Sequence, residues 1–299
     1  MIENAPLPRI ERWDALGDRL GVDLYIVRDD LLPFPLAGNK VRKLVAEISD
    51  CDRGTSIVTN GAVDSNHCRT VAWLAAERGL RAHLVLHDGT EQGASAPGLA
   101  VLQALGATYA VVPPNEISAE IDRAVSAFAR EDAPVRVVPG GCHSKRGAEA
   151  YRDAAEFVFN ELEIDAVYVA SGTGATQGGI AAAAHQAGTH TEVIGVSVAR
   201  PADRGIPPVA EATAWAGAPN APITFLDDFI AGGYGMSSPE LRAIVALGWR
   251  YGLPLDETYT GKAMWALKRH ADEGRLAGKR VLFWHTGGLW NRLAAGVFE

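Results

Sequence analysis

The sequence predicts an α/β protein that contains doubly wound parallel sheets, and three observations predict it. Short runs rich in β-branched residues alternate with longer helical patterns along most of the chain, which is typical of repeated βαβ units. The 299 residues exceed the usual size of one domain, so two domains or one large α/β domain are expected. Glycine-rich turns bound a block of three such units, which favours two domains: a smaller one at 45–140, inserted into a larger one made of 1–44 plus 141–299.

The strands and helices are expected in a regular order. In the first half, strands at 55–59, 81–87 and 109–113 alternate with helices at 65–79, 98–106 and 116–131. In the second half, strands at 135–139, 165–171 and 192–199 alternate with helices at 147–162 and 176–188. Residues 200–222 are rich in proline and predict a long irregular loop, which is often part of a binding site. Helical patterning returns at 239–252.

Composition excludes several classes of protein. The 28 basic and 36 acidic residues give a net charge of −8 without a basic stripe, so no nucleic-acid partner is expected. No apolar run is long enough for a membrane helix, and the N-terminus has no apolar core of a signal peptide, so we expect a cytoplasmic protein and no membrane partner. The three cysteines form no CxxC pair, which argues against disulfides and against a structural metal site.

Lys40 is the first candidate for chemistry. It follows a Gly-Asn pair and precedes a helical stretch in LAGNKVRKL, residues 36–44. A lysine that condenses with an aldehyde must be partly desolvated so that its neutral amine is accessible. The alternative interpretation is that Lys40 and Lys43 are two solvated charges at the start of a helix.

A glycine-rich turn at 171–176 follows a buried strand and precedes a small-residue helix. The turn predicts an anion site, because glycines let the backbone approach closely and the helix N-terminus points its N–H groups at the ligand. A phosphate is the expected guest. A nicotinamide dinucleotide fits less well, because Gln177 occupies the third glycine position and the next strand ends without an acidic residue, although Arg200 could face a ribose phosphate. A tight turn with no ligand is the third alternative.

Three further segments place polar residues at the ends of predicted elements. Ser65, Asn66 and His67 lie where a strand ends and a helix begins, which suits a substrate carboxylate, although Ser65 or Asn66 could simply cap the helix and leave His67 exposed. Tyr259 and Thr260 precede a late helix, and Thr286 lies between a strand and a Gly-Gly turn.

Taken in order, these segments resemble one family. LAGNKVRKL, TNGAVDSNHCRTVA, VASGTGATQGGI, DDFIAGGYG, ETYTGKAM and HTGG are similar to the landmarks of the D-cysteine desulfhydrase and 1-aminocyclopropane-1-carboxylate (ACC) deaminase family. These enzymes depend on pyridoxal 5'-phosphate (PLP) and have the tryptophan synthase β-subunit-like fold, called fold type II. The resemblance runs from about residue 36 to residue 288, and it makes a homodimer the default expectation.

The resemblance implies a role for each candidate residue. Lys40 would form the Schiff base with the cofactor, Asn66 would contact the ring hydroxyl, Tyr259 would lie near the pyridine ring and assist proton transfer, and Thr286 would meet the pyridine nitrogen. Ser65, with the N–H groups of Asn66 and His67, would bind the substrate carboxylate, and Thr260 would lie beside the substrate. The phosphate would be held by Gly172, Thr173, Gly174, Ala175 and Thr176.

The resemblance also implies a reaction. The deaminase branch resembles YEG and HLGG where this chain has YTG and HTGG, so Thr260 and Thr286 leave the pyridine without an acidic partner and favour β-elimination. The expected activity is that of a D-cysteine desulfhydrase, which forms pyruvate, sulfide and ammonia from a small amino acid. ACC deaminase and L-cysteate sulfo-lyase activities are the alternatives on the same scaffold, and a binding protein without turnover is a third.

The chain also departs from the family pattern. The segment 87–106 is shortened, Glu257-Thr258 replaces an expected Pro-Val, and LWNRLAAG follows HTGG. Lys145 and Arg146 stand where the family is usually apolar or small, which could hint at a more acidic substrate such as cysteate or could mark a solvated loop. These departures bear on the substrate more than on the cofactor.

Overall fold

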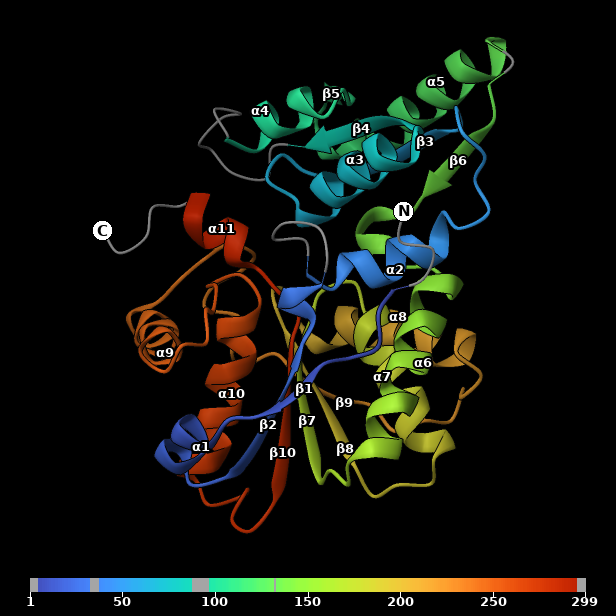
Figure 1. The fold of residues 1–299 in the computed structure, drawn as a ribbon. Helices are drawn as coiled ribbons and strands as arrows, with labels where there is room; N and C mark the ends of the chain where they lie inside the picture. The colour runs from blue at the N-terminus through green and yellow to red at the C-terminus, as the bar shows by residue number, and fades with distance from the viewer. Residues whose placement is uncertain (1–4, 33–37, 88–96, 132, 295–299) are drawn as a thin grey trace.

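A computed structural model describes residues 5–32, 38–87, 97–131 and 133–294. Two lobes are visible in Figure 1, each built around its own sheet, and the α/β fold class predicted from the sequence is confirmed. The boundaries suggested for two domains stay a prediction.

The larger lobe contains a six-stranded sheet in the order β1-β2-β10-β7-β8-β9. Strand β1 runs antiparallel to β2, and all other neighbours are parallel. Crossover connections therefore place the carboxyl ends of the parallel strands at one edge of the sheet, which is where α/β proteins bind ligands. The strands are β1 (Ile10–Arg12), β2 (Asp23–Arg28), β7 (Ala166–Ser171), β8 (Glu192–Ser197), β9 (Thr224–Leu226) and β10 (Arg280–His285).

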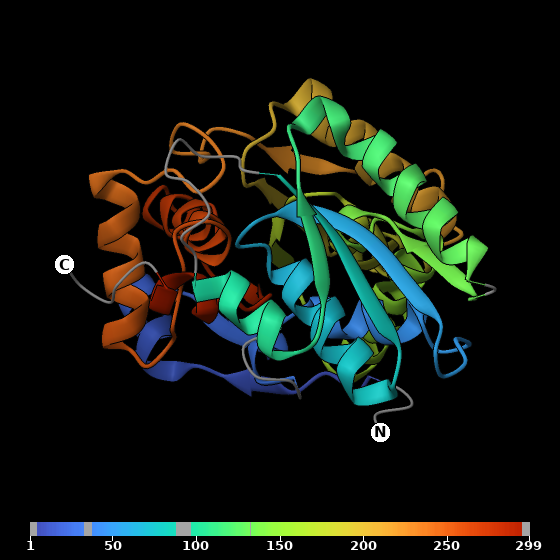
Figure 2. The same ribbon diagram turned by 90° about the horizontal axis from the view of Figure 1, so that it is seen from above.

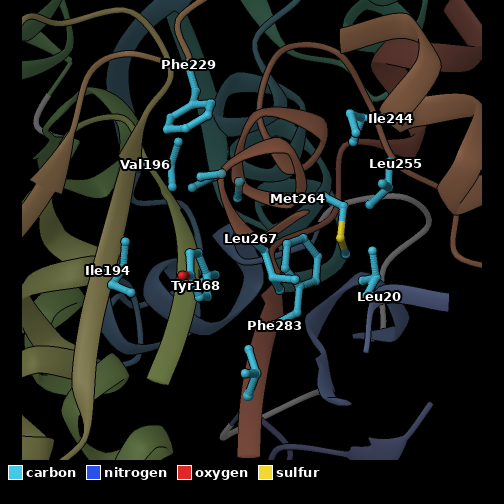
Figure 3. Close-up of a cluster of buried hydrophobic side chains, with 14 of the residues drawn as sticks. Leu20, Tyr168, Ile194, Val196, Phe229, Ile244, Leu255, Met264, Leu267 and Phe283 are labelled. Atoms are coloured by element: carbon cyan, nitrogen blue, oxygen red, sulfur yellow. The ribbon is translucent and has the colours of Figure 1, made fainter. Parts of the chain in front are cut away.

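Helices cover both faces of this sheet. One face packs against α1 (Asp14–Leu20), α9 (Pro239–Arg250) and α10 (Thr260–Asp272), and Figure 3 shows part of the resulting apolar cluster, with Tyr168 and Phe283 of the sheet below Met264 and Leu267 of α10. The other face packs against α6 (Lys145–Glu161) and α7 (Ala175–Gln186), which α8 (Ala202–Trp215) contacts from outside. Successive strand residues alternate between the two clusters, as the two-residue period of a strand requires.

The smaller lobe contains a four-stranded parallel sheet in the order β5-β4-β3-β6, seen from above in Figure 2. Its strands are β3 (Ser56–Ala62), β4 (Arg81–His87), β5 (Thr108–Val111) and β6 (Val135–Val138). Helices α2 (Lys40–Glu47), α3 (Asn66–Arg78), α4 (Pro97–Ala104) and α5 (Ile117–Arg130) surround it. Val41 and Leu44 of α2 belong to the apolar cluster of this sheet, so α2 packs on the smaller lobe. Helix α4 is the described part of the segment predicted to be shortened, and 88–96 lie outside the described residues.

The prediction of an irregular loop at 200–222 is wrong for its central part. Residues Ala202–Trp215 form α8, with Pro207 and Pro208 inside the helix. Each proline lacks the N–H that an internal helix position needs, at a cost of about 3 kcal/mol in an exposed helix. Close packing opposes that cost, because α8 lies so near α7 that a Cβ on Gly178 would meet the side chain of Ala212 at 2.5 Å. Tertiary packing therefore outweighs the local signal.

Lys145 and Arg146 were also expected in a loop, and this prediction is wrong. Both residues lie in the first turn of α6, which begins after the Ser144 cap. Arg146 donates two hydrogen bonds to Asp50, at 2.8 and 2.9 Å, and Lys145 lies 3.9 Å from Glu149. Both side chains are exposed on the outside of the helix.

A buried carboxylate joins the lobes. Asp29, which follows β2 and is fully buried, accepts hydrogen bonds from Arg42 of α2 at 2.7 Å, Tyr151 of α6 at 2.6 Å and Trp284 of β10 at 2.8 Å. Buried charges are costly unless they are paired and hydrogen-bonded, and three donors from three elements satisfy this one.

We expect Asp29→Ala to lower the free energy of unfolding by about 3–5 kcal/mol, because the substitution leaves the buried guanidinium of Arg42 without its carboxylate. Urea denaturation followed by circular dichroism measures the change. Glu131→Ala is the matched control, since it breaks the exposed ion pair with Arg81 and should cost less than about 1 kcal/mol. Equal losses in the two variants would contradict the role given to Asp29.

Candidate active site

The predicted site segments converge at the carboxyl edge of the large sheet, below the smaller lobe. Asn39, just before α2, holds three of them together. Its backbone N–H donates to the carbonyl of Thr286 at 3.0 Å, and its amide nitrogen donates to the hydroxyl of Thr176 at 3.2 Å. Its amide oxygen accepts from Nζ of Lys40 at 3.1 Å. The lysine, the glycine-rich turn and the Gly-Gly turn are therefore neighbours.

Lys40 has the environment expected of a reactive amine. The side chain is partly buried, and burial lowers the pKa of its amine well below the usual value, with the charge of Lys43 as the second cause. The approach to Lys40 is tight, because Gly38 has φ +60° and a Cβ there would lie 2.3 Å from the carbonyl oxygen of Thr286. A neutral amine is therefore accessible at a position that the backbone fixes.

The prediction that Lys43 is a helix-surface neighbour is wrong. Only 1% of Lys43 is exposed, and its Nζ donates to the carbonyl of Gly141 at 2.7 Å. Burial lowers the pKa of Lys43 to about 8. Gly141 packs on the glycine-rich turn, since a Cβ on it would lie 3.0 Å from the hydroxyl of Thr173. The spacing of three residues between Lys40 and Lys43 is a signal that could have revealed this, because such residues share one face of a helix.

The glycine-rich turn connects β7 to the N-terminus of α7. Gly174 has φ +97°, and a Cβ on it would lie 2.9 Å from the backbone of Pro208 and Val209, so only glycine fits. The hydroxyl of Ser171 is buried, and within the described residues it has no hydrogen-bond partner. The first N–H groups of α7 lack partners inside the helix. The turn thus presents several donors toward one place.

The segment from Ser65 to His67 starts helix α3. The hydroxyl of Ser65 accepts from the N–H of Cys68 at 3.4 Å, which confirms the expected cap. The guanidinium of Arg69 donates to the amide oxygen of Asn66. Because a guanidinium can only donate, this contact turns the amide nitrogen of Asn66 to the other side.

His67 is 2% exposed, so the alternative that it lies in solvent is wrong. Its Nε2 is 2.8 Å from the hydroxyl of Thr59, which donates its own hydrogen to the carbonyl of Val138 at 2.7 Å. Nε2 must therefore carry the proton, and Nδ1 is a buried acceptor that has no hydrogen-bond partner within the described residues. Burial lowers the pKa of His67 well below its usual value, and the charges of Lys40 and Lys43 lower it further.

Tyr259 precedes α10 and is paired with a tyrosine that the sequence did not single out. The hydroxyls of Tyr234 and Tyr259 are 2.6 Å apart. Burial raises the pKa of Tyr259 well above its usual value, and Tyr234 raises it further. Although 42% of Tyr234 is exposed, protein atoms around its hydroxyl raise its pKa to about 12. The aromatic residue within the glycine-rich landmark DDFIAGGYG was the available signal.

Thr260 lies in the same turn, where Asp256 organises the backbone. The carboxylate of Asp256 accepts from the N–H groups of Thr258, Tyr259 and Thr260 at 2.8–3.0 Å. The hydroxyl of Thr260 donates to Asp256 at 2.7 Å and is fully buried. A direct contact of Thr260 with substrate stays a prediction, and the observed contact is internal to the turn.

Two segments that depart from the family pattern lie together at this site. Arg292 of α11 (Leu289–Ala294) forms an ion pair with Glu257 at 2.9 Å. The guanidinium of Arg69 lies over the ring of Trp290, 5.0 Å from its centroid, so α11 also reaches α3 of the smaller lobe.

Comparison with known proteins decides the family. Residues 2–287 match the family model described as "Pyridoxal-phosphate dependent enzyme". The chain belongs to this family. It is 34% identical over 310 residues to a D-cysteine desulfhydrase of Klebsiella pneumoniae (strain 342), covering 95% of this chain and 92% of that protein. It is 36% identical over 301 residues to one of Yersinia pestis (strain Pestoides F), covering 93% and 90%.

Solved structures agree with this assignment. The crystal structure of an ACC deaminase homologue matches with a TM-score of 0.83 and 27% identity, covering 96% of this chain and 91% of the other. Threonine deaminase isoform 2 from Solanum lycopersicum matches with a TM-score of 0.68 at 17% identity, covering 97% and 82%, and supports the fold alone. The predicted PLP-dependent fold type II is confirmed, and a nicotinamide cofactor is no longer supported.

The residues at the edge of the large sheet fit PLP. The unpaired hydroxyl of Ser171, the first N–H groups of α7 and the cation of Lys43 suit a phosphate. Lys40, with its lowered pKa, suits condensation with the aldehyde. Within the described ranges, no group of three or more His, Cys, Asp or Glu side chains could hold a metal, and the three cysteines are free. In that same part of the chain, no helix is long and apolar enough to cross a membrane.

We expect Lys43→Met to weaken PLP binding by roughly tenfold to a hundredfold, because a charged donor near the phosphate is lost. The same change removes a positive neighbour of Lys40, so the pKa of Lys40 should rise and PLP capture, which needs the neutral amine, should begin at a higher pH. Absorbance titration with PLP over a pH series measures both effects.

Lys145→Met is the matched control, because it removes an exposed lysine from α6. An unchanged affinity and an unchanged pH midpoint in Lys43→Met would show that Lys43 does not act on the cofactor site.

Proposed function

We propose that this chain is a β-eliminating lyase that converts D-cysteine to pyruvate, sulfide and ammonia. One observation carries the proposal: Asn39 links the low-pKa amine of Lys40 to the phosphate turn through Thr176 and to the Gly-Gly turn through Thr286. Such an arrangement serves a lysine that holds PLP. The two D-cysteine desulfhydrases that cover almost the whole chain support the substrate.

The cofactor would be held at three points. The turn of Gly172, Thr173, Gly174, Ala175 and Thr176 would bind the phosphate together with Lys43, Lys40 would bind the aldehyde carbon, and the amide nitrogen of Asn66 would donate to the ring hydroxyl. A hydrogen bond supports the last role: Arg69 donates to the amide oxygen of Asn66, which leaves the amide nitrogen to donate to the cofactor. When bound, PLP supplies an electron sink for the electron pair released at the substrate Cα.

The substrate carboxylate would lie at the N-terminus of α3. The hydroxyl of Ser65 accepts from Cys68, so its own hydrogen is left to donate to a carboxylate. The N–H groups of Asn66 and His67 belong to the first turn of the helix, and the helix dipole favours a negative charge there.

Two groups would move protons. The amine of Lys40, whose lowered pKa makes its neutral form available, would take the Cα proton of the bound substrate. The Cβ–S bond then breaks with its electron pair passing to sulfur, and the raised pKa keeps Tyr259 protonated, so it would donate to the leaving sulfur rather than act as a base. Hydrolysis of the released enamine gives pyruvate and ammonia.

Thr286 supports elimination over ring opening. A threonine at this place offers a hydroxyl rather than a carboxylic acid, so it would not keep the pyridine nitrogen protonated. A neutral pyridine is a weaker electron sink, which suffices when a good leaving group departs. The hint of an acidic substrate finds no support, because Arg146 pairs with Asp50 and Lys145 lies near Glu149, away from Lys40.

Two further properties complete the proposal. We infer a cytoplasmic enzyme, which agrees with the three free cysteines, and a homodimer, which rests on the family resemblance alone. Light scattering of the purified holoenzyme would measure the dimer directly.

The test of the activity is a turnover assay over a panel of amino acids. We expect sulfide and pyruvate from D-cysteine to dominate over the products of L-cysteine, β-chloroalanine and L-cysteate. Detection of α-ketobutyrate from ACC as the main product would contradict the role given to Thr286 and favour the deaminase.

The cofactor lysine has a separate test. Borohydride reduction of the yellow holoenzyme, followed by peptide mass spectrometry, should place the pyridoxyl adduct on Lys40. Lys40→Met should form no adduct and lose at least about a thousandfold in turnover, because it lacks both the covalent link and the base. An adduct on Lys43 would overturn the assignment.

A further inference from the structure

Besides Lys43, the protein has a buried lysine in the large lobe that the proposed mechanism does not use. Lys262 is in the first turn of α10 and is 0% exposed. Its Nζ donates to the carbonyls of Val198 and Gly233, each at 2.7 Å. Burying an ammonium group costs free energy unless its donors are satisfied, so an apolar side chain would fill this space at lower cost. The two carbonyls show what this one connects.

Gly233 belongs to an irregular segment whose backbone is unusual. Ala231, Gly232, Gly233 and Gly235 all have positive φ, between +50° and +151°. The segment lies outside the helices and strands. Its backbone hydrogen bonds among the described residues close two local turns, from the N–H of Gly233 to the carbonyl of Ile230 and from the N–H of Met236 to the carbonyl of Gly233. Local turns do not fix where a segment sits on the protein, and the ammonium of Lys262 supplies a contact that does.

The tether acts beside the tyrosine pair. Tyr234 directly follows Gly233, and its hydroxyl is 2.6 Å from that of Tyr259. Tyr259 is the residue before α10, and its carbonyl accepts from the backbone N–H of Lys262 at 3.2 Å. The side chain of Lys262 therefore binds the residue before Tyr234, and its backbone N–H binds Tyr259 itself.

The second acceptor extends the connection to the phosphate turn. Val198 follows β8, and its N–H donates to the carbonyl of Ser171, at the start of the glycine-rich turn, at 3.1 Å. The side chain of Val198 is also the group nearest to a Cβ built on Gly172, at 3.6 Å. The ammonium of Lys262 thus fixes the loop of Tyr234 relative to the strand end that supports this turn.

We propose that Lys262 is a positioning residue that holds Tyr234 against Tyr259 and fixes the position of the two tyrosine hydroxyls relative to the phosphate turn. This inference rests on the proposed function, in which Tyr259 donates a proton to the leaving sulfur. Lys262 touches neither substrate nor cofactor, and it acts through the carbonyl of Gly233. A lysine suits the task because its long stem crosses the buried layer and its three N–H donors serve both carbonyls. Burial lowers the pKa of Lys262 to about 8, and the neutral amine still keeps two donors for these two acceptors.

A double-mutant cycle tests the proposal in the holoenzyme. Lys262→Met keeps an unbranched apolar side chain of nearly the same length and removes its donors, and Tyr234→Phe removes the hydroxyl. Each single change should lower kcat by about tenfold with less than about a twofold change in KM, and Lys262→Met should add less than about twofold in the Tyr234→Phe background. Losses that multiply to about a hundredfold in the double variant, or no loss in Lys262→Met, would overturn the inference.

Two further variants guard the comparison. Lys268→Met, on the same helix but in an exposed pair with Asp272, is the matched control and should retain wild-type kcat. Lys262→Gln, whose side chain is one atom shorter and keeps a neutral donor, is the milder change should Lys262→Met not fold. It is expected to show the same lack of additivity with Tyr234→Phe, and full additivity would again overturn the proposal.

A readout independent of turnover separates failure of this inference from failure of the proposed function. Amide hydrogen exchange of residues 227–237 in the protein without substrate should be at least about tenfold faster in Lys262→Met, while exchange of α3 is unchanged. Ultraviolet titration, with Tyr234→Phe as the reference, should show the pKa of Tyr234 moving down from about 12 toward the ordinary tyrosine value of about 10. Unchanged exchange and titration would overturn the tether even in an active enzyme. If exchange and titration both change as expected but the wild-type enzyme releases no sulfide from D-cysteine, the tether stands and only the proposed activity is rejected.

Discussion

The fixed position of the start of α2 depends on the buried carboxylate of Asp29. Arg42 of α2 donates to one carboxylate oxygen, and Tyr151 of α6 and Trp284 of β10 donate to the other. Tyr151 is also 3.3 Å from the carbonyl of Asn39, so the same cluster reaches the residue that joins Lys40 to the two turns. A helix that packs its apolar face on the smaller lobe is in this way fixed to the larger one. The reactive amine stands at the first residue of that helix.

The electrostatics of the site follow from this placement. Val41 and Leu44 of α2 pack on the small sheet, while Nζ of Lys40 donates to Asn39 and Nζ of Lys43 donates to the carbonyl of Gly141. Burial lowers the pKa of both amines, and the charge of Lys43 lowers the pKa of Lys40 further. Burial and the charges of both lysines likewise lower the pKa of His67 and keep it neutral. A bound phosphate would favour the protonated form of these lysines, because its negative charge attracts their ammonium groups. The cofactor is therefore expected to stabilise the fold as well as to perform the chemistry.

Much of the fold and most of the site could be predicted from the sequence, and the failures share a cause. Local sequence patterns predict the alternation of strands and helices. Lys40, the glycine-rich turn and Ser65 lie at the ends of these predicted elements. Lys43 looked exposed because lysine usually is, and its burial accompanies a contact with Gly141, which lies 98 residues further along the chain. Helix α8 contradicts its prolines because packing on α7 outweighs them. Tyr234 lies in a segment without periodicity, so no local rule could place its hydroxyl beside that of Tyr259.

Two of the departures from the family pattern, at Glu257 and in the segment after the Gly-Gly turn, lie together in the structure. Glu257 stands where a proline was expected and Arg292 lies in the altered segment after the Gly-Gly turn, and the two changes meet in an ion pair that balances their charges. Trp290, in the same altered segment, covers the guanidinium of Arg69, which in turn orients Asn66. None of these residues belongs to the phosphate turn or to α2. A change at Glu257, Trp290 or Arg292 can therefore alter the wall between α3 and α11 without altering the residues proposed to hold the cofactor phosphate.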